Sequence, residues 1–254
     1  MTWNSKDLDD GPVPMWSQIA ERLRGAIADG SFKPGDVLPG EAELNRRFAV
    51  SRTTSRAALD YLETEGLIKR KSGRGSIVIE PRIDRPLNRL SSFSEDMRAR
   101  GLNPSYKTRS LQLTLAISPV AAELKIAPNS AVLEIDRVLF ADGSPMATSL
   151  TYLAPAAFER SGLPTVADLD SGSLYRWLDK VAGISLIGGR EHIEGAIADP
   201  ITTRSLGLKH PAVVLICHRT SWTSENRPVE HGIMHYRADR YSFQVGLAQQ
   251  DRGG

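Results

Sequence analysis

The sequence contains little that would suit an extracellular or membrane protein. It has one cysteine, Cys217, so no disulfide can form within a single chain, and this fits a reducing compartment. No apolar run approaches the ~18 residues of a membrane-spanning helix, and the polar start, MTWNSKDLDDGP, matches neither a signal peptide nor an anchor. The formal charge is only +2, so affinity for a polyanion would have to come from local clusters. We therefore expect a cytoplasmic protein.

Familiar catalytic and metal-binding motifs are also missing. The sequence has no Walker loop, no dinucleotide fingerprint and no nucleophilic serine elbow. His231 and His235 lie in a strand-like segment, which would put their side chains on one face but ~13 Å apart, too far for one metal ion. We expect neither a cofactor nor a metal site.

The composition and the predicted secondary structure change along the chain. Residues 1–10 are predicted to be a disordered leader, and residues 11–80 a compact helical unit that ends in a hairpin. Residues 81–92, with two prolines and scattered charges, are predicted to be a linker. Residues 93–248 are rich in strand patterns, and residues 249–254 are predicted to be a tail. The hydrophobic fraction of 41% allows each unit to bury a core.

The first unit has the pattern of three helices and a hairpin. Apolar residues recur at helical spacing from Trp16 to Ile27, and the glycine and proline of DGSFKPGD end this helix. A second short helix is predicted from Glu41, and Ser51 is a suitable N-cap for a third. The segment LIKRKSGRGSIVI then predicts two short strands around a basic turn. This order is typical of a helix-turn-helix with a wing.

Basic residues gather where such a unit would meet DNA. Arg52 and Arg56 lie one turn apart on the third helix, with Thr53 between them, and an arginine fork matches guanine O6 and N7. The segment 46–56 holds four arginines and no acid, and the segment 69–74 holds four basic residues and no acid. A solvated helix face beside an ordinary charged hairpin would explain the arginine pair alone. The helix cap, the apolar inner face and the basic wing together favour DNA binding.

The segment from Pro14 to Val78 resembles the winged-helix domain of the GntR family of bacterial transcription regulators. The matching motifs are G-x-F-K-P-G-D-x-L-P-x-E-x-E-L, F-x-V-S-R-x-T-x-R-x-A-L-x-x-L-x-x-E-G-L and G-R-G-x-x-V. The resemblance implies that Arg52 and Arg56 contact bases or phosphates and that the wing tip enters the minor groove. The residues predicted to bind DNA are Arg47, Ser51, Arg52, Thr53, Thr54, Arg56, Lys71, Gly73 and Arg74.

The second helix departs from the family pattern. The family usually has Ser-Glu-Arg-Glu at its start, where this sequence has GEAE. Gly40 can still cap the helix, but Ala42 replaces an arginine that contacts a base or phosphate in many relatives. We expect a weaker salt dependence of DNA binding, or a different operator base, than a relative with that arginine would have.

The second unit is predicted to be an α+β domain on an antiparallel sheet. Seven strand candidates follow residue 93, and ADGSP and SENRP predict hairpin turns. The segments LSSFSEDMRARG, VLEIDRVLFADGSPM, GSLYRWL and RPVEHGIMHYRADRYSF resemble the UTRA effector-binding domain of the HutC subfamily, whose fold is related to chorismate lyase. The whole chain is therefore predicted to be α+β, with an N-terminal winged helix-turn-helix domain and a chorismate-lyase-like effector domain.

The resemblance also implies an effector pocket on the sheet, closed by the loop after the linker. Arg137 matches an arginine that holds an anion, whereas Leu139 and Ser149 replace a second arginine and an acid of relatives that bind phosphorylated sugars. This combination suits a small anion, such as a carboxylate, phosphate, phosphonate or phosphorylated metabolite. An ordinary sheet position, or a salt bridge between Arg137 and Glu230, would explain the same residues. The predicted pocket comprises Ser91, Ser92, Phe93, Ser94, Arg137, Thr151, Tyr152, Arg190, Glu230 and Tyr236.

These features predict a ligand-responsive transcription regulator located at the nucleoid. We expect a repressor that binds a palindromic operator as a homodimer and is released by a small anionic metabolite. Two alternatives remain at this point. One is a chorismate-lyase-like enzyme with a DNA-binding appendage, in which Glu230 would be the acid or base. The other is an architectural DNA-binding protein that needs no ligand.

Overall fold

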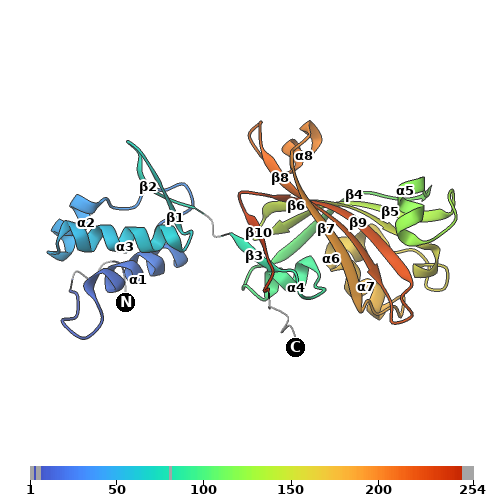
Figure 1. Ribbon diagram of the computed structural model, residues 1–254, viewed down its shortest axis with the longest axis horizontal. Helices are drawn as coiled ribbons and strands as arrows, with labels where there is room; N and C mark the ends of the chain where they lie inside the picture. The colour runs from blue at the N-terminus through green and yellow to red at the C-terminus, as the bar shows by residue number, and fades with distance from the viewer. Residues whose placement is uncertain (1–2, 4–6, 80–81, 248–254) are drawn as a thin grey trace, which may run out of the picture. The chain divides into compact units, whose positions relative to one another are not determined.

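The computed structural model describes residues 3, 7–79 and 82–247, and the chain forms two compact units with the boundary between Arg82 and Ile83 (Figure 1). Unit 1 is helical with a two-stranded hairpin, and unit 2 is built on a six-stranded sheet. Within the described ranges, no helix has the length and apolar character needed to cross a membrane.

Unit 1 contains the three predicted helices around one core. Helices α1 (Met15–Ala28) and α3 (Arg52–Thr64) pack together, and α2 (Glu41–Phe48) lies against α3. The core is apolar and largely aliphatic, because each helix turns a stripe of such residues inward. Its fully buried members include Ile19, Leu23, Leu44, Leu59, Leu62 and Ile68.

Local geometry fixes the turn before α3 and the wing after it. Ala49 has a left-handed φ of 53°, which ends α2, and the Ser51 hydroxyl accepts a hydrogen bond of 3.2 Å from the Thr54 N–H at the start of α3. Strands β1 (Ile68–Lys71) and β2 (Gly75–Val78) pair antiparallel. Gly73 in their turn has a φ of 74°, a conformation that favours glycine.

The start of the chain contacts unit 1 where a disordered leader was predicted. The Trp3 ring lies edge-on to Phe32 and Phe48, with centroid distances of 5.4 and 6.2 Å. The Asp7 carbonyl accepts a hydrogen bond from Arg22, and the Asp9 N–H donates to Gln18. The packing of an indole at the edge of a small core produces no helix or strand pattern, so it could not be predicted from the pattern of residues.

The sheet of unit 2 is antiparallel throughout, as predicted. Its strand order is β4-β5-β6-β9-β8-β7, and hairpins join β5 to β6 and β8 to β9. A register shift next to Thr108 marks a bulge where β4 pairs with β5. The strands span Pro104–Leu115 (β4), Ala131–Ala141 (β5), Ser144–Leu153 (β6), Gly188–Ile197 (β7), Val213–Trp222 (β8) and Pro228–Arg237 (β9).

Helices cover both faces of the sheet (Figure 1). Helices α6 (Val166–Ser171) and α7 (Leu174–Lys180) pack on the face that carries Leu133 and Ile135, and α4 (Phe93–Arg98) contacts β4. Helix α5 (Ser118–Leu124) packs on the opposite face, against Val132. The remaining helical segments are α8 (Pro200–Ser205), which contacts β6, and the short η1 (Pro155–Ala157). We call the face under α6 and α7 the inner face.

A short strand lies within the segment that was predicted to be a linker. Strand β3 (Ile83–Pro86) pairs in parallel with β10 (Tyr241–Gln244), so these residues belong to unit 2. The side chain of Arg85 is 2% exposed and forms ion pairs with Asp96 at 3.2 Å and Glu191 at 2.8 Å. The sequence of this segment is mostly polar because one of its two buried residues is an arginine, and its partner Glu191 is distant in the sequence.

Four of the five histidines share the outer face of the sheet. They lie on the neighbouring strands β7, β8 and β9. The ring centroid of His218 is 6.3 Å from that of His192 and 6.5 Å from that of His231. Among the described residues, no group of three or more potential ligands could hold a metal ion. Burial lowers the pKa of His231 and His235 below the ordinary 6.5, although Glu123 and Asp199, respectively, act in the opposite direction.

Unit 2 is expected to lose stability when the pH falls from about 7.5 to about 5.5. The unfolded chain takes up protons on His231 and His235 near pH 6.5, whereas the folded chain takes them up only at lower pH. The contribution of these two histidines to the free energy of unfolding is therefore complete above pH 6.5. It is lost as the pH falls through their pKa values in the folded chain. Urea denaturation at both pH values should show a smaller loss in the His231→Gln/His235→Gln variant. An identical loss in wild type and variant would contradict this assignment.

Candidate DNA-reading surface and effector cavity

The first turn of α3 presents free polar side chains. Arg52 and Thr53 are exposed, and Arg52 forms no hydrogen bond or ion pair with a described residue. The buried residues of the same helix are Ser55, Ala58, Leu59 and Leu62. The helix therefore separates an apolar side from a solvent-facing side that begins with an uncommitted guanidinium, as the sequence predicted for a recognition helix.

Two of the arginines predicted to bind DNA contact other residues of unit 1. Arg56 forms an ion pair with Glu41 at the start of α2, with Nε 2.9 Å from the carboxylate, and this interaction lowers the pKa of Glu41. Arg47 lies with its guanidinium 4.2 Å from the Trp3 ring centroid and donates a 2.8 Å hydrogen bond to the Trp3 carbonyl. Arg56 remains exposed, so DNA could replace Glu41, but Arg47 is half-buried and does not join the surface.

The wing presents the other predicted residues. Lys71, Gly73 and Arg74 are exposed, and neither cation forms an ion pair with a described residue. Arg70 points instead to α3, where it pairs with Asp60 at 2.9 Å. The start of α2 has the two residues that differ from the family pattern. Gly40 precedes the helix in an extended conformation, and Ala42 is exposed but offers no polar group. We call Arg52, Thr53, Arg56, Lys71 and Arg74 the basic surface.

A small cavity on the inner face of the sheet has Arg137 on its floor. The cavity has a volume of about 40 Å³, and Arg137 on β5 is 5% exposed. Its Nε and Nη1 atoms have no hydrogen-bond partner among the described residues, and its guanidinium lies 5.1 Å from the Tyr106 ring centroid. Burial lowers the pKa of Arg137, while Tyr106 and Glu230 act in the opposite direction. An arginine fork without a carboxylate is suited to binding an anion that enters the cavity.

Hydroxyl groups and one carboxylate line the rest of the cavity. Ser149 and Thr151 on β6 both face it, and their hydroxyls lie 3.0 Å apart. Glu230 on β9 lines the same cavity, but its carboxylate accepts hydrogen bonds from Tyr175 at 2.9 Å and Ser221 at 2.7 Å. The salt bridge considered between Arg137 and Glu230 is not formed. Both residues therefore remain candidates to contact a ligand.

The loop predicted to close the pocket is the start of a helix. The Ser92 hydroxyl caps α4 by accepting from the Glu95 N–H, and the Glu95 carboxylate accepts from the Ser92 N–H. Ser92 and Phe93 line the cavity. Ser94 lies at its outer side, with its hydroxyl 3.2 Å from that of Ser92. Ser91 does not line the cavity, because its hydroxyl donates to Asp96 at 2.8 Å.

Three of the residues predicted to line the pocket do not line this cavity. Tyr152 faces the outer side of the sheet and packs in the core under α5. Arg190 is exposed and pairs with Glu123 at 2.9 Å. Tyr236 is on the inner face but packs against Tyr241, with ring centroids 4.5 Å apart, in a separate core. The outward orientation of Tyr152 and Arg190, and the packing of Tyr236 against Tyr241, therefore keep these side chains out of the cavity.

The structure adds residues that the sequence analysis missed. Tyr106, Ser173, Tyr175 and Arg219 line the cavity, and Arg219 donates hydrogen bonds to the Tyr175 hydroxyl at 3.1 Å and the Ser91 carbonyl at 3.0 Å. Burial raises the pKa of Tyr175 well above its ordinary value, so it stays a neutral donor to Glu230. The alternation of buried and exposed residues along β8 and the GSLYRWL motif indicate that these residues lie near the sheet. Neither pattern predicts which buried polar groups contact each other.

The two units match different families. Residues 16–78 match the family described as bacterial regulatory proteins, gntR family, and residues 99–242 match the UTRA domain. The HTH-type transcriptional repressor NagR of Bacillus subtilis is 33% identical over 91% of this chain and 94% of its own length. The mannosyl-D-glycerate transport/metabolism system repressor MngR of Escherichia coli is 27% identical over 94% of this chain and 98% of its own length.

Solved structures share the arrangement. PhnF from Mycobacterium smegmatis aligns with a TM-score of 0.74 and 25% identity, over 93% of this chain and all of that chain. The effector domain of the same protein aligns alone with a TM-score of 0.58 and 23% identity, which supports the fold of unit 2. These relatives are named as transcriptional regulators, not as enzymes.

Proposed function

The chain belongs to the GntR family of bacterial regulatory proteins and carries a UTRA domain, and from this premise we propose that it is a homodimeric repressor of a palindromic operator, released when a small anion binds unit 2. The observation that carries the proposal is Arg137, a buried guanidinium whose Nε and Nη1 have no hydrogen-bond partner among the described residues, in a cavity lined by hydroxyl groups. An architectural DNA-binding protein would have no use for such a group. A DNA-bound repressor also implies a cytoplasmic location at the nucleoid.

The basic surface supports the DNA half of the proposal. A helix enters the major groove with its first turn toward the base edges, which is where Arg52 and Thr53 lie. Lys71 and Arg74 on the wing are free to contact phosphates or the minor groove. A two-fold dimer would present two such surfaces to half-sites ~34–36 Å apart, so the operator should be palindromic.

Arg52→Ala is expected to weaken binding to a duplex selected from a random pool by ~1–3 kcal/mol, or roughly 5- to 150-fold, and to relax base preference. The reason is the loss of a bidentate donor that has no ion-pair or hydrogen-bond partner among the described residues. Fluorescence anisotropy with wild type, Arg52→Ala and the charge-matched control Arg160→Ala measures the effect. Arg160 is exposed in unit 2. Equal affinities for Arg52→Ala and the control would remove Arg52 from the reading role.

A chain of buried polar contacts supports a route from the cavity to the strand that follows the boundary between the units. Tyr175 and Arg219 line the cavity, Arg219 pairs with Glu191, and Glu191 pairs with Arg85 on β3 at 2.8 Å. Strand β3 begins at Ile83, directly after the boundary. An anion that moves Tyr175 or Arg219 would change these contacts. If the anion binds the released conformation more tightly than the operator-binding conformation by ~3 kcal/mol, it lowers operator affinity about 150-fold.

A further inference from the structure

The cavity at Arg137 is too small to hold a metabolite alone. Its volume of about 40 Å³ exceeds the ~10–15 Å³ that one water needs, but it is far below the ~300–1,000 Å³ of ligand pockets. An outer pocket of about 370 Å³ lies between α4 and α7 and shares Ser92, Ser173 and Tyr175 with the cavity. A bound metabolite would therefore place one end in the cavity and the rest in the outer pocket.

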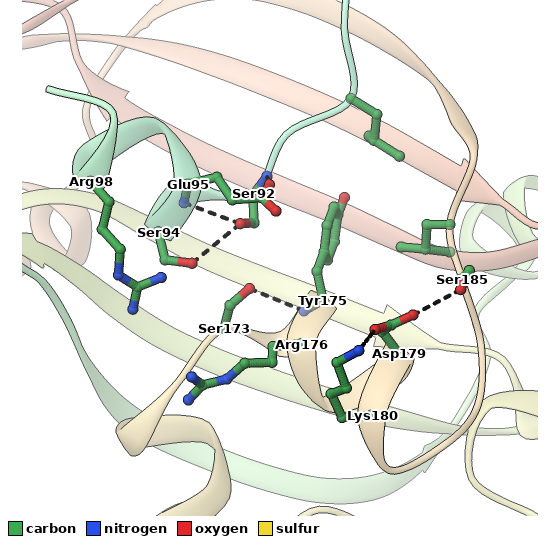
Figure 2. Close-up of a pocket in the computed structure, with 12 residues that line it drawn as sticks. Ser92, Ser94, Glu95, Arg98, Ser173, Tyr175, Arg176, Asp179, Lys180 and Ser185 are labelled. Carbon is green, nitrogen blue, oxygen red and sulfur yellow. Dashed lines mark hydrogen bonds and ion pairs between the residues drawn. The ribbon is translucent and has the colours of Figure 1, made fainter.

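Two further arginines line the outer pocket, one from each helix. Figure 2 shows Arg98 reaching from α4 and Arg176 from α7, with Ser94 and Ser173 between them in this view. Both arginines are exposed, and neither forms an ion pair with a described residue. The Arg176 guanidinium makes only a long 3.4 Å hydrogen bond to the Ser171 carbonyl.

The acids of the outer pocket are committed to other groups. The Glu95 carboxylate accepts from the Ser92 N–H at 2.8 Å as part of the cap of α4. The Asp179 carboxylate pairs with Lys180 at 2.9 Å and accepts from Ser185 at 2.8 Å (Figure 2). Arg98 and Arg176 thus lack an ion-pair partner among the described residues, and the lining of the outer pocket carries more cations (Arg98, Arg176 and Lys180) than acids (Glu95 and Asp179).

Tyr106 connects these two arginines with Arg137. Burial raises the pKa of its hydroxyl, and a hydrogen bond with Ser94 and the positive charges of Arg137, Arg98 and Arg176 lower it. The Arg137 guanidinium lies 5.1 Å from the Tyr106 ring centroid, and Arg98 and Arg176 are close enough to act on the same phenol electrostatically. The cavity and the outer pocket are therefore both positively charged, which favours an anion in each.

We propose that the effector carries two anionic groups, one bound by Arg137 in the cavity and one held between Arg98 and Arg176 in the outer pocket. This inference rests on the proposed function, since it assigns the second half of the same ligand. The chemical class is a short metabolite with an anion at each end, such as a phosphorylated carboxylic acid. Hydroxyls on its backbone would meet Ser92 and Ser173, which line both the cavity and the outer pocket.

The test compares ligands that differ in one anionic group. Inorganic phosphate, glycerol phosphate and a series of phosphorylated carboxylic acids with two to five intervening carbons are titrated into the full chain by calorimetry. At least one two-anion ligand should bind about ten- to a hundredfold more tightly than glycerol phosphate, because a charged hydrogen-bonded pair is added. Arg98→Gln and Arg176→Gln should each weaken the binding of the two-anion ligand more than the binding of glycerol phosphate, and so reduce that preference. Arg204→Gln, an exposed arginine of α8, is the control.

The possible outcomes separate this inference from the proposal on which it rests. Equal affinities for one-anion and two-anion ligands, with both sensitive to Arg137→Met, would overturn the second anion site and retain the first. A preference for two anions that survives Arg98→Gln and Arg176→Gln would also overturn it. Binding that ignores Arg137→Met, or no binding by any of these anions, would overturn the anionic effector itself.

Discussion

Glu191→Gln should lower the free energy of unfolding of unit 2 by ~3–5 kcal/mol, the largest effect on stability that we expect from a single substitution. Glu191 pairs with both Arg85 and Arg219, whose side chains are 2% and 5% exposed. The two guanidinium groups hold the pKa of Glu191 below its ordinary value in spite of burial. Removal of the carboxylate charge leaves Arg219 without an ion-pair partner among the described residues and Arg85 with Asp96 alone.

Hydrogen exchange of the β7–β9 amides in increasing urea measures this loss within unit 2. Glu194→Gln is the matched control, because Glu194 lies on the same strand, is exposed and has only His218 as a partner, at 3.5 Å. The control should change stability by less than ~1 kcal/mol. Because the pKa of Glu191 is depressed, its contribution is present above pH 4.5 and is lost as the pH falls through the folded-state value. Equal stabilities for the two variants would contradict the buried network.

Arg137→Met should abolish anion binding and yet leave unit 2 as stable as before, or more stable. Replacement of a buried charge without a partner by an apolar side chain is often neutral or stabilising by ~1–4 kcal/mol. Loss of the bidentate donor should weaken anion binding by about a hundredfold or more. A purely structural arginine would show the opposite pattern, with lost stability.

Thermal unfolding with and without anions gives both readouts for Arg137. Wild type should melt at a higher temperature with a bound anion, and Arg137→Met should show no such shift. Arg137→Lys keeps the charge but not the fork, so it should retain part of the shift. A full anion-dependent shift in Arg137→Met would place the anion elsewhere.

The fold was predictable where its signals are local. The cap at Ser51, the wing glycine Gly73 and the hairpin turns depend on neighbours within a few residues, and the structure contains all of them. Strand β3 was missed because its partner β10 lies about 160 residues away and one of its two buried residues is Arg85. A charged residue in a polar segment suggests solvent unless its distant partners are known.

The cavity was predictable only in part, and strand geometry explains which part. Thr151 and Tyr152 are consecutive in β6, so they face opposite sides of the sheet and could not both line the cavity. Arg190 fails for the same reason, because its neighbour Glu191 faces the inner side. Arg137 and Glu230 were predicted from the sequence and do line the cavity, whereas the places of Tyr175 and Arg219 depend on the packing of α7 over the sheet.

The most direct test of the account measures DNA affinity and its release by an anion in one experiment. A duplex selected by the full chain from a random pool is titrated by anisotropy, alone and with a panel of phosphorylated and carboxylated metabolites. The account predicts a two-fold symmetric duplex, tight binding by wild type and Arg137→Met alike, and release of wild type alone by at least one member of the panel. Failure to select any duplex, or release of both proteins by the same anion, would contradict it.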